Sequence, residues 1–299
     1  MPDETLSEVV SRLSASAHAL AAIGMALDAR VSGTPPAPEV APWLDAALKE
    51  LGVAEPIAQA SPLERETLLG EIRVFTLTNA RMLFAASQGP GWTHREPELL
   101  EAAGDVSAGV PHRIRNALAP RLPGLAERLA APGATFLDIG VGVARMSLEM
   151  MRLWPDLRVV GIEPLPQALA LAREKVRAEG LESRIELREG RGEDLTDESR
   201  FDLAWVPSLF IPEAAVPRVL ARVHAALRPG GWVLVPSVKP STDPLATALV
   251  RLRVAGFGGL NGSPEVVEGL LRDAGFTGVA TLPSPPASTG SMVVARKAP

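Results

Sequence analysis

Hydrophobic residues in the first third of the chain recur every three or four positions, which is the period of an amphipathic helix. This spacing predicts three helices, over Leu6–Leu27, Trp43–Leu51 and Ser61–Ser87. Gln88-Gly89-Pro90-Gly91 is expected to break the third helix. Residues 92–110 are polar with scattered apolar positions and are predicted to form a linker with a short helix.

A different pattern follows a predicted helix at His112–Ala130. Short apolar runs predict strands at Thr135–Ile139, Arg158–Ile162, Ile185–Glu189, Phe201–Val206, Trp232–Pro236, Gly278–Leu282 and Ser291–Arg296. Amphipathic segments between them predict helices at Ala144–Leu153, Pro166–Glu179, Pro212–Leu227, Asp243–Val254 and Pro264–Asp273. Alternation of this kind implies parallel βαβ units with right-handed crossovers. We therefore expect an α/β fold in which an all-helical domain (1–110) precedes a Rossmann-like, doubly wound domain (111–299).

The composition narrows the chemistry. The 299 residues include no cysteine, which excludes disulfides, Cys-ligated zinc, iron–sulfur clusters and a thiol nucleophile, and no metal site is expected. The net charge of -5 argues against a nucleic-acid partner. The start of the chain is acidic where a signal peptide would be basic, and no uninterrupted apolar run reaches the length of a membrane span. We expect a cytoplasmic enzyme without a membrane partner.

The strongest motif is Phe136-Leu-Asp-Ile-Gly-Val-Gly-Val-Ala-Arg145, a strand that leads through a glycine turn into a helix. Gly140 and Gly142 let the backbone pass close to a ligand and present amide groups at the helix N-terminus. Such turns also carry glycine for geometry alone.

Glu163 strengthens the motif because it ends the next predicted strand. In a doubly wound sheet that position faces the ligand crevice, where a carboxylate can accept hydrogen bonds from ribose hydroxyls. The alternative is a carboxylate that caps the helix after it.

These motifs, together with Gly190–Leu195, Phe201–Trp205 and Leu227–Trp232, make residues 112–299 resemble the class I S-adenosylmethionine-dependent methyltransferases. The resemblance implies a seven-stranded, mostly parallel sheet that ends in an antiparallel hairpin. It also implies S-adenosylmethionine as the cofactor and a small-molecule acceptor, in keeping with a biosynthetic role. The N-terminal helical region resembles the cap or dimerisation region of small-molecule methyltransferases, which suggests a homodimer.

The resemblance also assigns residue roles. Asp138 would orient the loop and approach the methionine amino group, Gly140 and Gly142 would lie against the cofactor, and Glu163 would hold the ribose. The remaining cofactor-binding candidates are Pro164, Gly192, Glu193, Asp194 and Trp205. The family often has Asp after Gly190, whereas this chain has Arg191, so the adenine contact passes to Glu193, Asp194 or backbone groups.

Three residues before the core are candidate bases for removing a proton from the acceptor. His94 is the first choice, with Glu96 behind it, and His112 is the third. For each, the alternative is a solvated linker residue or a helix cap. Trp92, Trp205, Phe210 and Phe257 are candidates to line an apolar acceptor pocket, or are ordinary core residues.

Several rival functions fit less well. A nicotinamide dehydrogenase requires a third glycine where this chain has Arg145. Adenine and glutamine amino methyltransferases resemble one another in an Asn/Asp-Pro-Pro-aromatic motif, which Val206-Pro-Ser-Leu-Phe210 does not match. An aminopropyl transferase would want paired acidic residues at that place. A non-catalytic cofactor-binding protein remains an alternative, although Asp138 and Glu163 are both present.

Overall fold

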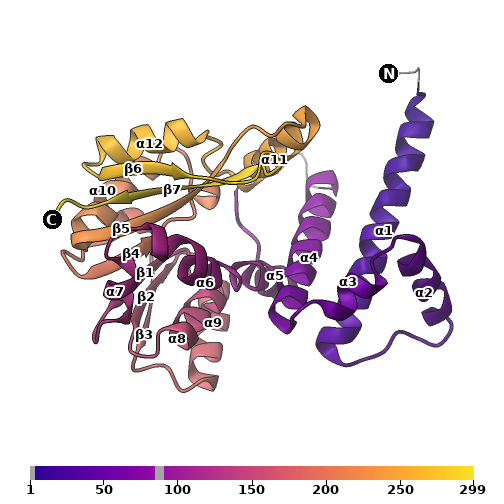
Figure 1. The fold of residues 1–299 in the computed structure, drawn as a ribbon, viewed down its shortest axis with the longest axis horizontal. Coiled ribbons are helices and arrows are strands. Elements are labelled where there is room, and N and C mark those ends of the chain that lie inside the picture. The colour runs from indigo at the N-terminus through magenta and orange to yellow at the C-terminus, as the bar shows by residue number, and fades with distance from the viewer. Residues whose placement is uncertain (1–3, 85–90) are drawn as a thin grey trace. The chain divides into compact units, whose positions relative to one another are not determined.

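The computed structural model describes residues 4–84 and 91–299, and the chain forms two compact units (Figure 1). One unit comprises Met1–Leu83 with Glu101–Gly109, and the other comprises Phe84–Leu100 with Val110–Pro299. The chain passes from one unit to the other after Leu83, Leu100 and Gly109. The division into domains at 1–110 and 111–299 stays a prediction.

The second unit is built on a seven-stranded sheet with the order β3-β2-β1-β4-β5-β7-β6. Its strands are β1 Thr135–Ile139, β2 Arg158–Glu163, β3 Ile185–Glu189, β4 Phe201–Trp205, β5 Leu227–Val238, β6 Thr277–Leu282 and β7 Gly290–Arg296. The first five strands are parallel, and β7 runs antiparallel to both of its neighbours. This confirms the predicted Rossmann-like sheet with an antiparallel C-terminal pair. Successive strands are added on one side of β1 up to β3 and on the other side from β4 onward, and such sheets form a ligand crevice at this switch point between β1 and β4.

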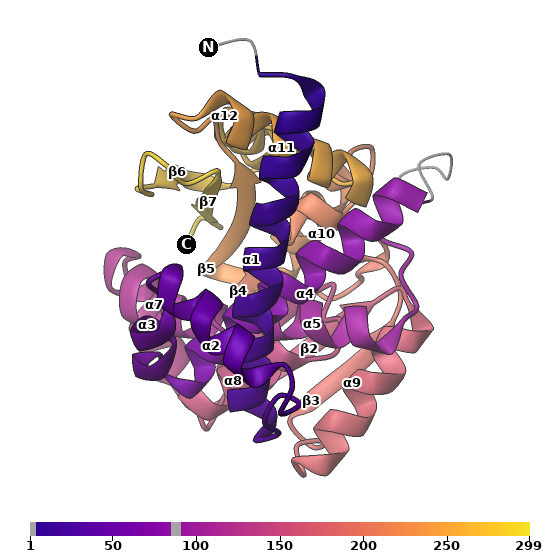
Figure 2. The same cartoon turned by 90° about the vertical axis from the view of Figure 1, so that its right-hand side faces the viewer.

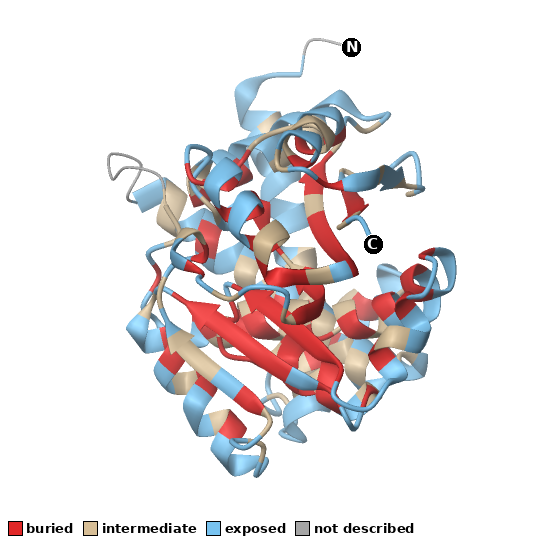
Figure 3. Ribbon diagram, turned by 90° about the vertical axis from the view of Figure 1, so that its left-hand side faces the viewer, coloured by how far each residue is buried: buried red, intermediate tan, exposed pale blue. Residues whose placement is uncertain are grey.

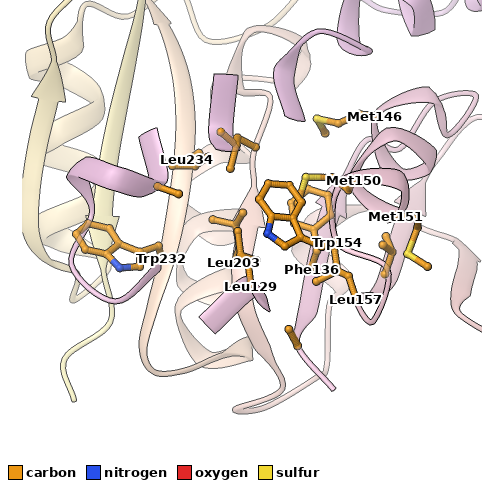
Figure 4. Close-up of a cluster of buried hydrophobic side chains, with 14 of the residues drawn as sticks. Leu129, Phe136, Met146, Met150, Met151, Trp154, Leu157, Leu203, Trp232 and Leu234 are labelled. Carbon is orange, nitrogen blue, oxygen red and sulfur yellow. The ribbon is translucent and has the colours of Figure 1, made fainter. Parts of the chain in front are cut away.

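Helices cover both faces of this sheet, and its central strands are buried (Figure 3). The helices are α7 Leu125–Ala130, α8 Arg145–Leu153, α9 Pro166–Ala178, α10 Val216–Ala226, α11 Pro244–Phe257 and α12 Pro264–Asp273. Because side chains alternate along a strand, Phe136 of β1 packs with Met150 and Trp154 on one face (Figure 4), while Leu137 packs among residues of α10 on the other. At one edge, α9 lies beside β3 (Figure 2).

The helix predicted at His112–Ala130 is wrong as a single element. The chain instead forms α6 Val110–Arg113, a π-turn η1 Ile114–Leu118, a 3-10 turn η2 Ala119–Arg121, and then α7. Pro120 and Pro123 have no N–H to donate, and Gly124 is left-handed with φ +75°. Short 3-10 turns also occur as η3 Gly192–Asp194 and η4 Ser208–Phe210.

The helix predicted from Pro212 begins four residues later, at Val216. Pro212 instead forms an isolated antiparallel β-bridge with Gly259. The fifth strand is longer than predicted, since it runs from Leu227 to Val238.

The described residues of the first unit form helices and their connections. The helices are α1 Leu6–Ser32, α2 Ala41–Glu50, α3 Ala54–Gln59 and α4 Pro62–Phe84. α5 Pro97–Ser107 fills much of the predicted linker, and its residues from Glu101 onward group with this unit. The sequence pattern did not predict α3. The predicted end of the third helix at Ser87, and most of the break after it, lie outside the described residues. A small core unites α1 through α4 around Leu27, Leu48 and Leu69.

The N-terminal half of α1 differs from expectation, because its apolar stripe is exposed. Leu6, Val10 and Leu13 are 80%, 54% and 52% exposed, and the buried residues of α1 begin only at Gly24. Among the described residues, α1 alone is long and apolar enough to cross a membrane by length and composition. A core helix and a signal sequence pass the same test, so the expectation of no membrane partner stays a prediction.

Candidate active site

The glycine loop between β1 and α8 is held against β2 by its own backbone. The N–H groups of Gly140 and Val141 donate to the carbonyl of Ile162 at 2.8 and 3.1 Å. Gly140, Gly142 and Ala144 all adopt left-handed φ angles, of +69°, +56° and +64°. A Cβ placed on Gly142 would meet no atom within 4 Å, whereas one on Gly140 would lie 3.3 Å from Pro207. The open surface of the loop is therefore at Gly142.

Asp138, on β1, is a buried carboxylate with one unoccupied oxygen. Ser147 of α8 donates its hydroxyl to Oδ2 at 2.7 Å, while Oδ1 has no hydrogen-bond partner among the described residues. Burial raises the pKa of Asp138 to about 7; the Ser147 hydrogen bond opposes this shift, and the negative charge of Glu163 adds to it. A buried acceptor without a donor is costly, so this oxygen is suited to receive a donor from a ligand.

Glu163, the last residue of β2, bridges the glycine loop and the start of α9. Its Oε2 accepts from the Gly142 N–H and its Oε1 from the Leu165 N–H, both at 2.9 Å. Burial raises the pKa of Glu163, and these two backbone hydrogen bonds lower it. The helix-cap alternative is thus present in the structure. It does not exclude a ligand, because each carboxylate oxygen can accept a second hydrogen bond.

Two further residues shape this corner of the sheet. Gly161 lies beside Asp138 in the sheet, and a Cβ there would approach Val141 to 2.7 Å. Trp205 is the β4 residue aligned with Asp138 on the other side. Only a glycine at 161 allows the loop to pack this closely on β2, a role that sequence analysis did not find.

The other predicted cofactor residues differ from one another in burial and in the contacts that they make. Gly192 is buried, and a Cβ on it would meet Ile139 at 3.0 Å and Val219 at 3.1 Å, so this glycine serves close packing. Glu193 is partly exposed, 3.9 Å from Arg218. Pro164 and Asp194 are exposed, after β2 and in η3 respectively.

Four aromatic rings from distant segments form an aromatic cluster, which comprises Trp92, His94, Phe210 and Phe257. Trp92 meets His94, Phe210 and Phe257 edge-on, at centroid distances of 4.5, 4.9 and 5.2 Å. Phe210 stacks on Phe257 at 5.0 Å. His94 is 8% exposed, so it is not a solvated linker residue. The structure thus places the first-choice base among three of the four predicted pocket aromatics.

The cluster is anchored next to the loop that follows β4. The Ser208 hydroxyl donates to the carbonyl of Pro236 at 2.7 Å, and the Leu260 N–H donates to the carbonyl of Ser208 at 2.9 Å. A Cβ on Gly259 would collide with the carbonyl of Leu209. These contacts fix Phe210 and Phe257, and Pro207 of the same loop abuts Gly140.

The other two candidate bases have local roles. Glu96 is exposed, accepts from the Arg95 N–H at 3.0 Å and supplies the carbonyl that starts α5. His112 is hydrogen bonded through Nε2 to Glu149 of α8 at 2.7 Å. His94 packs against Trp92 in the aromatic cluster, so it is the better-placed candidate. Across residues 4–84 and 91–299, no group of three His, Asp or Glu side chains could hold a metal ion.

Comparison with known proteins identifies a domain within the second unit. A family model described as a methyltransferase domain matches residues 136–231, from β1 into β5. This part of the chain is therefore a methyltransferase domain. The chain is 30% identical over 169 residues to the release factor glutamine methyltransferase of Geobacter sulfurreducens, covering 53% of this chain and 56% of that protein. It is 31% identical over 147 residues to a demethylmenaquinone methyltransferase of Deinococcus radiodurans, covering 49% of this chain and 58% of that protein. It therefore spans a little over half the length of these curated relatives.

Solved structures share the fold along nearly the whole chain. An O-methyltransferase family protein from Burkholderia thailandensis has a TM-score of 0.66 at 15% identity, with 98% of each chain covered. The pyocyanin biosynthetic protein PhzM has a TM-score of 0.65 at 19% sequence identity, again with 98% of each chain covered. Human N-acetylserotonin methyltransferase, solved with S-adenosylmethionine, has a TM-score of 0.59 at 16% sequence identity, with complete coverage of both chains.

The residues of the site fit S-adenosylmethionine. Gly142 offers a bare stretch of backbone, the free oxygen of Asp138 suits an ammonium group, and Glu163 has lone pairs left for ribose hydroxyls. Sequence analysis also missed Ser147. The feature that could have identified it is a hydroxyl on the otherwise apolar buried face of α8, nine positions after Asp138.

Proposed function

We propose that this methyltransferase transfers a methyl group from S-adenosylmethionine to an oxygen of a small-molecule acceptor, in the cytoplasm. The observation that carries the proposal is the open backbone at Gly142 beside two buried carboxylates, one of which has an oxygen without a donor. The choice of oxygen is supported by solved structures of the same fold, which include an O-methyltransferase family protein and the mitomycin 7-O-methyltransferase MmcR.

The chain's own residues have to bind, orient and exclude water. When bound, S-adenosylmethionine supplies an activated methyl group for in-line displacement. Asp138 and Glu163 would hold its ammonium and ribose groups, and Gly142 would carry it on the backbone. Alignment of the reacting atoms is the main contribution of such a site, with effective molarities of about 10⁵–10⁸ M in favourable cases.

We propose the aromatic cluster as the acceptor side, with His94 as the general base. An acceptor hydroxyl loses its proton as the new C–O bond forms and the C–S bond breaks, and the imidazole would take that proton. The burial of His94 and its contact with Trp92 support this role, as does the anchoring of Phe210 beside the loop that touches Gly140.

The test has two stages. Calorimetry with S-adenosylmethionine measures binding, and mass spectrometry then measures S-adenosylhomocysteine and methylated product after incubation with hydroxylated acceptors. Binding followed by stoichiometric methylated product supports the proposal. Binding without turnover across phenolic, aliphatic-hydroxyl and amine acceptors would favour a non-catalytic cofactor-binding protein, and no binding would contradict the site itself.

We also propose that α1 pairs two copies of the chain into a homodimer. Its exposed stripe of Leu6, Val10 and Leu13 supports this, because three apolar residues at i, i+4 and i+7 make one continuous helix face. Light scattering should report a dimer that becomes a monomer in the Val10→Glu, Leu13→Glu double variant. Recovery of the unmodified protein in the membrane fraction would instead make α1 a membrane element.

A further inference from the structure

Two serine hydroxyls are buried side by side where β5 meets β7. Ser237 and Ser291 are directly paired across the strands, and only 2% and 7% of each residue is exposed. Neither Oγ has a hydrogen-bond partner among the described residues. An unsatisfied buried hydroxyl is unfavourable, so this pair calls for a partner from outside the chain.

Ser291 lines a cavity of about 400 Å³ at this end of the sheet. The cavity lies between the ends of β5 and β6, the start of β7 and the first residues of α12. We call it the α12 cavity, and its polar lining is Lys239, Glu265, Thr281, Ser284 and Ser291. It contains none of the residues of the glycine loop or the aromatic cluster.

Hydrogen-bond donors line the α12 cavity, among them the ammonium of Lys239 and the hydroxyl of Ser291. Lys239 donates its Nζ to the carbonyls of Pro285 and Ser284, at 2.8 and 3.4 Å, which leaves its third hydrogen for a ligand. α12 begins at Pro264, and Ser263 before it makes no side-chain bond to the helix backbone, so the helix start adds partial positive charge.

Glu265 adds the opposite charge to the lining of the cavity. Glu265 is exposed, and the hydroxyl of Ser263, followed by the N–H of Glu265 itself, lowers the pKa of its carboxyl group. The Thr281 hydroxyl is already engaged by Glu268 at 2.7 Å. Lys239 and Ser291 therefore make the one face of the cavity that favours an anion.

We propose that the α12 cavity is a second ligand site, which binds the oxyanion group of a small carboxylate- or phosphate-bearing molecule through Lys239 and Ser291. The ammonium supplies the charge, and the Ser291 hydroxyl supplies a hydrogen bond. The proposal does not depend on the methyl-transfer chemistry.

Amide NMR of the full chain tests the site with two probes, inorganic phosphate and acetate. Saturable shifts at Gly290, Ser291 and Glu265 are expected with at least one probe, and the probe that binds more tightly identifies the preferred oxyanion. Lys239→Met should weaken the binding by about tenfold, the effect of one charge-assisted hydrogen bond. Lys297→Met is the matched control, because Lys297 also donates hydrogen bonds to two backbone carbonyls but does not line the cavity.

Three outcomes would overturn the proposal. The first is an absence of saturable shifts with either probe, which would mean that water alone occupies the cavity. The second is an equal response to chloride at the same ionic strength. The third is undiminished binding in both Lys239→Met and Ser291→Ala. Thermal unfolding of each variant verifies that it is folded, and loss of cofactor binding elsewhere leaves this result unaffected.

Discussion

The cofactor half and the acceptor half of the candidate site are built in different ways. The cofactor half comes from one stretch of chain, in which Ile162 and Glu163 accept the N–H groups of the glycine loop. The acceptor half is assembled from three segments far apart in sequence, which meet through ring contacts of Trp92. Hydrogen bonds from the loop backbone to the Ile162 carbonyl and the Glu163 carboxylate fix the first half, whereas the second half depends on which rings are present. The first should therefore be common to the fold and the second specific to this chain.

The largest effect should come from Gly142→Leu. The side chain would occupy the open face of the loop and abolish cofactor binding, while the left-handed φ of +56° costs about 1–2 kcal/mol of folding free energy. Gly180→Leu is the matched control, because Gly180 has φ +66° and equally open surroundings. Calorimetry should show binding lost in the first variant and kept in the second at a similar melting temperature. Retained affinity in Gly142→Leu would break the assignment of the cofactor half.

His94→Gln separates the two halves. If His94 takes the acceptor proton, kcat should fall by about 10²–10⁴-fold, because a positioned base contributes that much. The cofactor dissociation constant should not change. His18→Gln, an exposed change on α1, should leave both quantities as they are. An unchanged kcat in His94→Gln would show that the histidine is a packing residue and not the general base.

Glu163→Ala removes the carboxylate that joins β2, the glycine loop and α9. Cofactor binding should weaken by about 1.5–3 kcal/mol, the range for hydrogen bonds to a charged group. The melting temperature should also fall, because the N–H groups of Gly142 and Leu165 lose their acceptor. Glu174→Ala, on the exposed side of α9, is the control. A variant that loses stability but binds normally would leave Glu163 as a helix cap only.

The smallest effect is a pH dependence that comes from Asp138. Its pKa of about 7 in the folded protein lies above its ordinary 3.8, so the folded state keeps a proton that the unfolded chain releases. This group therefore makes the free energy of unfolding fall as the pH rises from about 4 to about 7. Cofactor affinity should change in the opposite direction, rising about fivefold between pH 6 and pH 7, because an ammonium pairs with the ionised form and the ionised fraction grows by about that factor.

Asp138→Asn tests that prediction directly. It should flatten both pH profiles, weaken cofactor binding at pH 8 and leave the fold intact, since the amide can still accept the Ser147 hydroxyl. Calorimetry and thermal unfolding across the pH series provide the measurement. Parallel profiles for the wild type and the variant would show that Asp138 does not titrate on binding.

The predictability of the site follows the same division. Asp138, Gly142 and Glu163 stand at the ends of consecutive predicted strands, and parallel strands bring their carboxyl ends together, so their meeting follows from local pattern. The grouping of His94 and Phe257 around Trp92 does not, because nothing near the histidine or the phenylalanine in sequence indicates that both rings contact the same tryptophan. Gly192 shows the limit of motif reasoning, since its neighbours show a packing role that a glycine in a loop does not reveal.

The fold shows a similar limit. Strands and helices of the second unit follow the hydrophobic period closely, with differences of a few residues at most ends. The prediction failed at 112–130, where apolar spacing suggested one helix and the prolines at 120 and 123 divide it. It also failed for the exposed half of α1, because periodicity identifies an apolar face but not what covers that face.

The position of β7 in the sheet has a consequence for synthesis. The last strand of the chain inserts between β5 and β6, so the sheet cannot close until these C-terminal residues have left the ribosome. Until then β5 presents an unpaired edge rich in valine, the kind of edge that recruits other chains. A premature stop before Gly290 would make that state permanent, and the shortened product should aggregate even though every residue of the cofactor half is present.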